Sequence, residues 1–200
     1  MKLRLHATQP HSRANGPGVR YVIWVQGCTL ACPGCFNPET HTSEEGYLHS
    51  TGDLAADVLA VARAGNIEGV TFSGGEPLEQ SEALLEFFDA LEKNGRETSN
   101  LSRILFTGWT RSEIAREARA REVLERVDAA VCGRYDRSRH APRGVLASSN
   151  QELVLVSKRY RRSDFQAAAS SEAIIHGDGT ITLTGIRPLS GITTPSADIP

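Results

Sequence analysis

The sequence lacks a hydrophobic run long enough to cross a membrane. Its longest strongly apolar run, residues 21–25, is far shorter than the roughly 20 residues that a transmembrane helix needs. Residues 1–11 lack the apolar stretch of a secretory signal peptide. We therefore expect no membrane partner and a cytoplasmic location.

A strong charge of one sign is also missing. The 22 Lys and Arg residues nearly balance the 24 Asp and Glu residues, and the formal net charge is −2. This balance gives no electrostatic argument for nucleic acid as a partner. Residues 158–162 form one basic run, Lys-Arg-Tyr-Arg-Arg, which we interpret as a solvated face or as a docking surface for an acidic patch on a protein.

Cysteine is scarce, and its placement excludes a disulfide framework. Three of the four cysteines, Cys28, Cys32 and Cys35, fall within eight residues, and Cys132 lies about a hundred residues downstream. A disulfide framework would distribute its cysteines and would need an oxidising compartment. Clustered cysteines indicate a metal or redox chemistry instead.

The cluster has the spacing C-x3-C-x2-C. Thiolates this close can each bind a different iron of one [4Fe–4S] cubane, which leaves the fourth iron open to a substrate or cofactor. Gly27 and Gly34 permit a tight wrap of the loop. Two alternatives remain at this point: an electron-transfer cluster, and a zinc site with His41 or Cys132 as the fourth ligand.

The chain has no internal repeat, and strand-like segments alternate with helical ones, which predicts a parallel α/β sheet. We expect one domain of this size. Thr51 is the expected N-cap of the first helix, and Thr110 with Glu113 has the pattern of a capping box. The expected strands are 21–25, 69–72, 103–106, 127–132 and 152–156. The main expected helices are 54–64 and 78–93, and Asn94-Gly95 ends the second of them. The final expected hairpin pairs 174–176 with 180–184.

Four polar segments follow predicted strands directly. They are the cysteine loop, Ser73-Gly74-Gly75-Glu76-Pro77, Thr107-Gly108-Trp109 and Cys132-Gly133-Arg134. In parallel α/β sheets, ligands bind where loops leave the carboxyl ends of the strands. We therefore expect the four segments to converge on one site, with the Arg-rich segment 133–149 as a long functional loop beside it.

Several blocks resemble the radical S-adenosylmethionine (SAM) activating enzymes of glycyl radical enzymes, and most of all the activating proteins of anaerobic ribonucleoside-triphosphate reductases. The two most specific blocks are Asn15-Gly16-Pro17-Gly18-Val19-Arg20 and Trp24-Val25-Gln26-Gly27-Cys28 with Cys32-Pro33-Gly34-Cys35-Phe36-Asn37. The resemblance continues through the segments at 73–77, 106–110, 131–134, 148–151 and 179–185.

The resemblance implies a fold and two cofactors. The fold is a partial TIM-type barrel with parallel strands and a C-terminal β-hairpin over residues 1–188, followed by a loose tail at 189–200. Cys28, Cys32 and Cys35 would bind a [4Fe–4S] cluster, and SAM would chelate its open iron. The implied SAM-binding residues are Ser73, Gly74, Gly75, Glu76, Phe36, Asn37, Thr107 and Trp109.

The resemblance also implies an activity. One electron from a flavodoxin-type or ferredoxin-type donor would cleave SAM to methionine and a 5′-deoxyadenosyl radical, which abstracts hydrogen from a glycine of an anaerobic ribonucleotide reductase or a similar glycyl radical enzyme. One alternative is a compact radical SAM enzyme acting on a peptide or a small heterocycle. The other is a non-catalytic Fe–S or zinc module.

Some residues depart from the family pattern. Asn15 stands where Asp is common, His41 where Trp is expected, and Cys132 where an acidic residue is frequent. We interpret His41 as a histidine on the surface of a loop. We interpret Cys132 as a small buried residue, because free Cys usually behaves as a small hydrophobe. Arg20 is assigned a structural role, and Trp109 could contact SAM or pack in the core.

Overall fold

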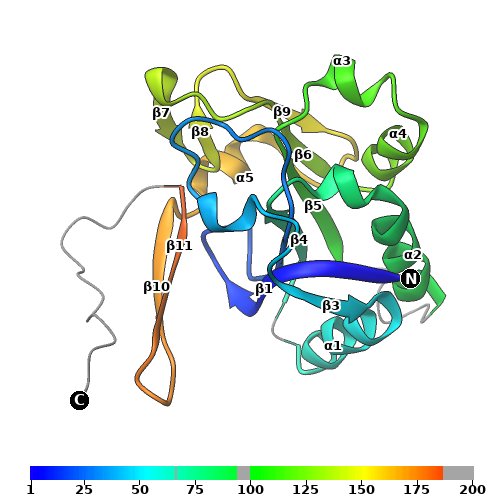
Figure 1. The fold of residues 1–200 in the computed structure, drawn as a ribbon. Coiled ribbons are helices and arrows are strands. Elements are labelled where there is room, and N and C mark those ends of the chain that lie inside the picture. Colours follow the sequence, from blue (N-terminus) through cyan, green and yellow to red (C-terminus); the bar gives the residue numbers. More distant parts are fainter. Residues whose placement is uncertain (66, 94–99, 187–200) are drawn as a thin grey trace.

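A mixed seven-stranded sheet organises the computed structural model, which describes residues 1–65, 67–93 and 100–186 (Figure 1). The strand order is β3-β1-β2-β4-β5-β6-β9, so that the sheet is open, with β3 and β9 at its edges. Its four central strands are parallel: β2 (Arg20–Val25), β4 (Gly69–Gly74), β5 (Ser102–Thr107) and β6 (Ala129–Cys132). The antiparallel strands are β1 (Lys2–Ser12), β3 (Tyr47–Ser50) and β9 (Glu152–Leu155). The predicted α/β class with an incomplete barrel is confirmed, and its centre is parallel as expected. The last expected strand, β9, differs because it pairs antiparallel with β6.

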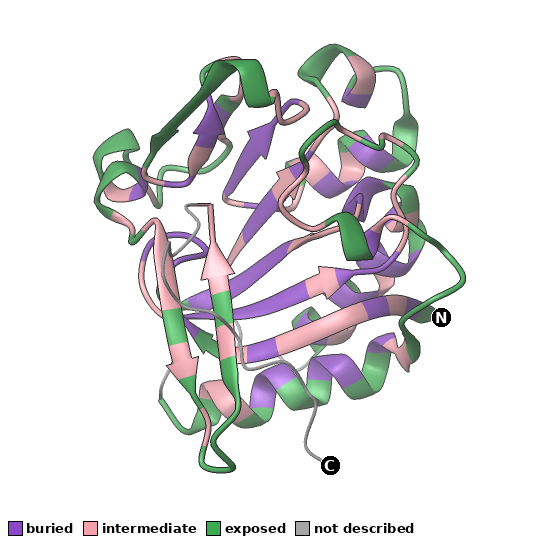
Figure 2. Cartoon of the chain, turned by 60° about the vertical axis from the view of Figure 1, so that its left-hand side comes forward, coloured by how far each residue is buried: buried purple, intermediate pink, exposed green. Residues whose placement is uncertain are grey.

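Helices cover one face of this sheet and bury its main core (Figure 2). Successive residues of a strand point to opposite faces, so Phe72, Leu105 and Ala130 face the helical side. The Phe72 ring packs edge-on against Phe87 and Phe88, with centroids 5.5 Å apart in both pairs. The helices are α1 (Thr51–Arg63), α2 (Ser81–Lys93), α3 (Arg111–Ile114) and α4 (Ala118–Glu125).

The opposite face carries a second, smaller core and an open hollow. Ile104, Ala129 and Phe165 belong to this second core. Closer to the carboxyl ends of the strands, Trp24, Ser73, Phe106 and Val131 form a row that lines a cavity. Around this face lie β7 (His140–Arg143), β8 (Leu146–Ser148), α5 (Arg162–Ala167) and the predicted C-terminal hairpin of β10 (Ser171–Ile175) and β11 (Ile181–Gly185).

Arg20 anchors the other end of the sheet, where the parallel strands begin. Its guanidinium is fully buried and donates to the Thr71 hydroxyl at 2.6 Å, the Ser102 hydroxyl at 3.0 Å and the Tyr160 hydroxyl at 3.1 Å. The structural role predicted for Arg20 agrees with these contacts. Because Tyr160 lies inside the basic run 158–162, that run is fixed at the amino ends of β2 and β5, away from the strand ends that hold the cavity.

Some local predictions were wrong. Ser50, not Thr51, is the N-cap of α1, and its hydroxyl accepts from the Asp53 amide. The expected helix 78–93 begins as a 3-10 helix, η2 (Pro77–Gln80), and the segment 133–149 contains the 3-10 helix η4 (Arg137–Arg139) and a small hairpin. The capping box of Thr110 and Glu113 is confirmed.

Two further predictions, the helix end at Asn94-Gly95 and the tail 189–200, lie outside the described residues. Within the described ranges, none of the helices combines the length and the apolar character that a membrane span requires.

Candidate active site

The cysteine loop leaves the end of β2 and closes back on its own base. The Gly27 amide donates to the Thr40 carbonyl at 2.8 Å, and the Cys28 amide donates to the His41 carbonyl at 3.0 Å. Between these ties, Ala31 (φ 45°) and Gly34 (φ 74°) turn the backbone through left-handed conformations, which a residue other than glycine adopts only at some cost. A short 3-10 helix, η1 (Pro38–Thr40), completes the loop.

The three clustered cysteines face one cavity. All are free, half-buried and part of the lining of a cavity of about 550 Å³, a size that falls in the usual range of small-molecule sites, roughly 300–1,000 Å³. Burial raises the pKa of the Cys28 and Cys35 thiols. The Asn37 amide donates to Cys35 Sγ at 3.4 Å, an arrangement that stabilises a thiolate ligand.

The turn after β4 lies against the base of the cysteine loop. The Glu76 amide donates to the Gly27 carbonyl at 2.9 Å. A Cβ atom on Gly75 would lie 2.2 Å from that carbonyl oxygen, and one on Gly74 (φ 95°) would lie 2.6 Å from the Val25 carbonyl oxygen. Only glycine therefore fits at both positions, and the pair brings two backbone segments together at the cavity wall.

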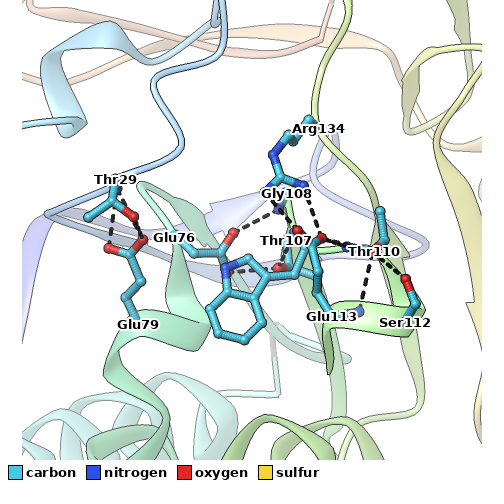
Figure 3. Close-up of polar contacts among 10 residues, drawn as sticks. Thr29, Glu76, Glu79, Thr107, Gly108, Thr110, Ser112, Glu113 and Arg134 are labelled. Carbon is cyan, nitrogen blue, oxygen red and sulfur yellow. Dashed lines mark hydrogen bonds and ion pairs between the residues drawn. The ribbon is translucent and has the colours of Figure 1, made fainter. Parts of the chain in front are cut away.

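The Glu76 carboxylate ties this turn to the end of β5 (Figure 3). One oxygen accepts from the Thr107 hydroxyl at 2.7 Å and from the Leu78 amide at 2.9 Å, and the other accepts from the Gly108 amide at 2.8 Å. Glu76 is only 1% exposed, and this burial raises its pKa to about 7, although the three hydrogen bonds oppose the shift.

Two further polar contacts hold the loops around this turn (Figure 3). Glu79 accepts from both the amide and the hydroxyl of Thr29, one residue after Cys28. Arg134 donates to both carboxylate oxygens of Glu113, at 2.9 and 2.8 Å, and holds the pKa of that carboxyl at about 2. These contacts link the ends of β2, β4, β5 and β6, as the expected convergence of strand-end loops requires.

The structure brings nearly all of the predicted site residues to the cavity. The lining includes Cys28, Cys32, Cys35, Phe36, Asn37, Ser73, Gly74, Gly75, Glu76 and Thr107. Trp109 differs, because it packs against the main core and is not among the lining residues. Its amide donates to Thr107 Oγ1 at 3.0 Å, so Trp109 touches the site through its backbone.

The sequence reasoning missed two lining or supporting residues, Gln26 and Thr184. Gln26 is buried, and its side-chain amide donates to the Glu39 and Thr42 carbonyls at 2.9 and 2.8 Å, while its oxygen lies 3.0 Å from His6 Nδ1. Thr184 from β11 lines the cavity and accepts from Asn15. Gln26 lies in the family block that precedes the cysteine motif, and Thr184 lies in the resembling segment 179–185. Membership of these segments is the signal that the sequence offers.

Two residues with competing interpretations are now placed. Cys132 is buried in the main core and outside the cavity lining, and burial raises the pKa of its thiol to about 12, as expected of an unreactive structural cysteine. The expectation of a surface position for His41 was wrong: it lines the cavity, and its Nε2 is buried without a hydrogen-bond partner among the described residues.

The residues present fit a [4Fe–4S] cluster. Three sulfur donors without a disulfide bond share one cavity wall. A cubane binds each such thiolate at a different iron. Cys28, Cys32 and Cys35 would hold such a cluster, and the adjoining cavity leaves room for a ligand.

Comparison with known proteins agrees with this donor set. The family described as "4Fe-4S single cluster domain" matches residues 14–154, which is more than two thirds of the chain. The chain belongs to this family. The matched segment contains the cysteine loop and the turn after β4, so the predicted iron–sulfur cofactor is confirmed at the level of the family.

Curated relatives add a more specific similarity. A pyruvate formate-lyase-activating enzyme of Listeria monocytogenes is 35% identical over 98 residues, which is 48% of this chain and 40% of that protein. One from Staphylococcus epidermidis is 38% identical over 104 residues, which is 49% of this chain and 40% of that protein. The chain thus spans about two fifths of the length of these relatives.

These relatives support the resemblance to activating enzymes of glycyl radical enzymes, and with it the predicted pair of a [4Fe–4S] cluster and SAM. Among solved structures, the crystal structure of QueE from Escherichia coli matches 55% of this chain and 54% of its own, with a TM-score of 0.44 and 22% identity.

Proposed function

We propose that this protein binds a [4Fe–4S] cluster through Cys28, Cys32 and Cys35 and uses it with SAM to abstract hydrogen from a glycine of a glycyl radical enzyme. One observation carries the proposal: the three cysteines and the turn at residues 73–76 line the same cavity, although they come from different strand ends. When reduced, the bound cluster supplies the electron that cleaves SAM to methionine and a 5′-deoxyadenosyl radical.

The residues around the cavity position the cofactors and exclude water. Gly74 and Gly75 present backbone without side chains, and Ser73 adds a hydroxyl beside them, which suits the polar methionine end of SAM. Trp24, Phe106 and Val131 supply an apolar wall, and a dry wall protects a radical from side reactions. Glu76 lines the cavity and also fixes the turn, because its carboxylate accepts hydrogen bonds from Thr107 and Gly108 at the end of β5.

A protein substrate suits the open architecture. A complete barrel of eight strands typically needs about 250 residues, and the sheet described above is open at both edges. Radical chemistry on a small molecule would leave the reacting atoms poorly shielded from water. A glycine-bearing loop of a large protein would close the site itself.

The finer assignment concerns which glycyl radical enzyme is activated. The sequence blocks favour an anaerobic ribonucleotide reductase, and the similarity to pyruvate formate-lyase-activating enzymes makes a pyruvate formate-lyase the second candidate. A flavodoxin-type or ferredoxin-type protein would supply the electron. Four free thiols suit a reducing compartment, so a cytoplasmic site of action belongs to the proposal.

The test is glycyl radical formation followed by electron paramagnetic resonance. The anaerobically reconstituted protein is mixed with SAM, a reductant, and either an anaerobic ribonucleotide reductase or a pyruvate formate-lyase. We expect a glycyl signal with the reductase and none when Cys32→Ala replaces the wild type. A signal with the lyase alone would redirect the assignment, and no signal with either enzyme despite SAM cleavage would point to a peptide or small-molecule substrate.

A further inference from the structure

An exposed basic hairpin lies beside the cysteine loop. Arg137 and Arg139, on η4, and Arg143, on β7, are exposed. None of them forms an ion pair within 4 Å in the described part of the chain, although Arg139 is close enough to Asp136 to contribute, after the hydrogen bond from Ser138, to the lowered pKa of that carboxyl. Asp136 is the sole acidic residue of the segment 133–149, and its carboxylate accepts from the amide and hydroxyl of Ser138. We call Arg137, Arg139 and Arg143 the arginine hairpin.

One member of the arginine hairpin, Arg137, is packed directly on the part of the loop that joins the last two cysteines of the motif. A Cβ atom on Gly34 would lie 2.9 Å from Arg137 Cδ, so the arginine stem covers that glycine. At the base of the hairpin, the Tyr135 ring packs on Phe36 with centroids 4.6 Å apart. Arg137 therefore lies over the loop that carries the proposed cluster ligands, with Arg139 on the same 3-10 helix and Arg143 on the strand that follows.

The three arginines do not belong to the cavity itself. Tyr135 and Val145, at the base of the hairpin, line the cavity, but Arg137, Arg139 and Arg143 do not. A substrate glycine must enter the cavity to react. An electron donor needs only to approach the cluster from outside, which is the position that the arginine hairpin offers.

Resting on the function proposed above, we propose that the arginine hairpin is the docking surface for an acidic one-electron donor protein. The chain has a net charge of −2, so at long range it repels an acidic partner weakly, and the local excess of positive charge orients the approach toward the cysteine loop. Complementary charge acts mainly on the association rate, which rises by 10-fold or more at low salt.

The electron count balances when the donor is a one-electron donor protein. A reduced flavin protein gives up one electron and the oxidised cluster gains it, while no covalent bond forms or breaks. Encounters of this kind bury little surface, typically below roughly 1,200 Å² in total. A small hairpin with three unpaired charges is adequate for such a contact.

The chain offers a matched control in its second basic run. Lys158, Arg159 and Arg161 are also exposed, but Tyr160 fixes this run beside Arg20 at the opposite ends of the strands. The variants R137Q/R139Q/R143Q and K158Q/R159Q/R161Q lower the net charge by the same amount. A difference between them therefore reports position and not overall charge.

The experiment measures reduction of the reconstituted cluster by a flavodoxin, an acidic flavin protein, in its fully reduced state. Stopped-flow absorbance gives the second-order rate constant at several salt concentrations, and titration with oxidised flavodoxin gives Kd without any turnover. Photoreduced deazaflavin, a small uncharged reductant, serves as the reference. The double variant R139Q/R143Q keeps Arg137 against Gly34, in case the triple variant disturbs the loop.

We expect R137Q/R139Q/R143Q to lose at least about 10-fold in rate constant at low salt, to bind oxidised flavodoxin more weakly, and to show a flatter salt dependence. R139Q/R143Q should lose an intermediate amount, the control triple little, and reduction by deazaflavin should be unchanged in all. Equal losses in the two triple variants, or no loss in either, would overturn the proposal.

Two other outcomes would also overturn it. One is a wild-type cluster that deazaflavin reduces and flavodoxin does not. The other is normal cluster reduction in R137Q/R139Q/R143Q with a loss only of glycyl radical formation, which would assign the arginines to the protein substrate. Failure of the proposed function can be told apart from failure of the docking proposal. If the proposed function is wrong, flavodoxin can still reduce the cluster at a measurable rate, but SAM is not cleaved.

Discussion

The Thr107 hydroxyl donates a 2.7 Å hydrogen bond to the buried carboxylate of Glu76. This contact joins the turn after β4 to the end of β5, two positions that are 31 residues apart in the chain. The same carboxylate accepts from the Gly108 and Leu78 amides. Glu76 therefore shapes the cavity wall, because it holds the loops that follow β4 and β5 against each other.

Titration of Glu76 should make stability depend on pH in an unusual direction. Folding raises its pKa from 4.5 to about 7, so between these values the folded chain binds a proton that the unfolded chain has released. The free energy of unfolding should fall as pH rises across this window, by up to about 3 kcal/mol. Urea unfolding of the metal-free chain at pH 5 and pH 8 measures the change. Glu76→Gln should flatten it, and an equal slope in both proteins would contradict the assignment.

Removal of the Thr107 hydroxyl should destabilise the fold without changing its shape. Thr107→Val leaves Glu76 with one donor fewer and the Trp109 amide without its acceptor, which should cost about 1–3 kcal/mol in the free energy of unfolding. Thr42→Val is the control, because among the described residues the Thr42 hydroxyl accepts only from the exposed Glu44 amide at 3.3 Å. It should change stability by less than about 0.5 kcal/mol. Equal effects at the two positions would show that the Glu76 network contributes nothing.

A single methyl group on Gly75 should displace the cysteine loop. The added Cβ would lie 2.2 Å from the Gly27 carbonyl oxygen, and Gly27 directly precedes Cys28. We expect Gly75→Ala to fold less stably and to retain well under half of the wild-type iron and sulfide after anaerobic reconstitution. Gly177→Ala is the control, because a Cβ there meets nothing within 4 Å. Full iron content in Gly75→Ala would show that the loop can move away freely.

The four cysteines should separate into two classes. Alanine at Cys28, Cys32 or Cys35 should abolish the [4Fe–4S] absorbance and leave unfolding of the metal-free chain nearly unchanged. Cys132→Ala should retain the cluster and lose about 1 kcal/mol of stability, because Cys132 is packed in the main core. Iron analysis and visible absorption measure the first effect, and urea unfolding measures the second. Loss of the cluster in Cys132→Ala would return Cys132 to the ligand set.

The sequence was most informative where chemistry and strand ends coincide. The cysteine spacing and the Gly-Gly-Glu-Pro turn each follow an apolar β-branched run, so the rule for parallel sheets predicted that they meet, and the cavity contains both. The glycine-rich turn at 177–179 likewise predicted the final hairpin, which the structure confirms.

Local sequence patterns could not predict contacts between residues that are far apart in the chain. β1 mixes polar and apolar residues and contains Pro10, so the sequence reasoning missed this 11-residue strand. It also missed β3, which is too short to show a period. The contact between Asn15 and Thr184 spans 169 residues, and no local pattern encodes it. Trp109 follows a strand as an active-site residue would, yet its ring packs against the helical side of the sheet.

Cleavage of SAM by the reconstituted protein tests the central claim most directly. The anaerobic protein, its cluster verified by absorption and iron content, is incubated with SAM and photoreduced deazaflavin, and 5′-deoxyadenosine is quantified by mass spectrometry. We predict 5′-deoxyadenosine with the wild type and none with Cys28→Ala, Cys32→Ala or Cys35→Ala. An intact, reducible cluster that yields no 5′-deoxyadenosine would contradict the account and would make the protein a non-catalytic iron–sulfur module.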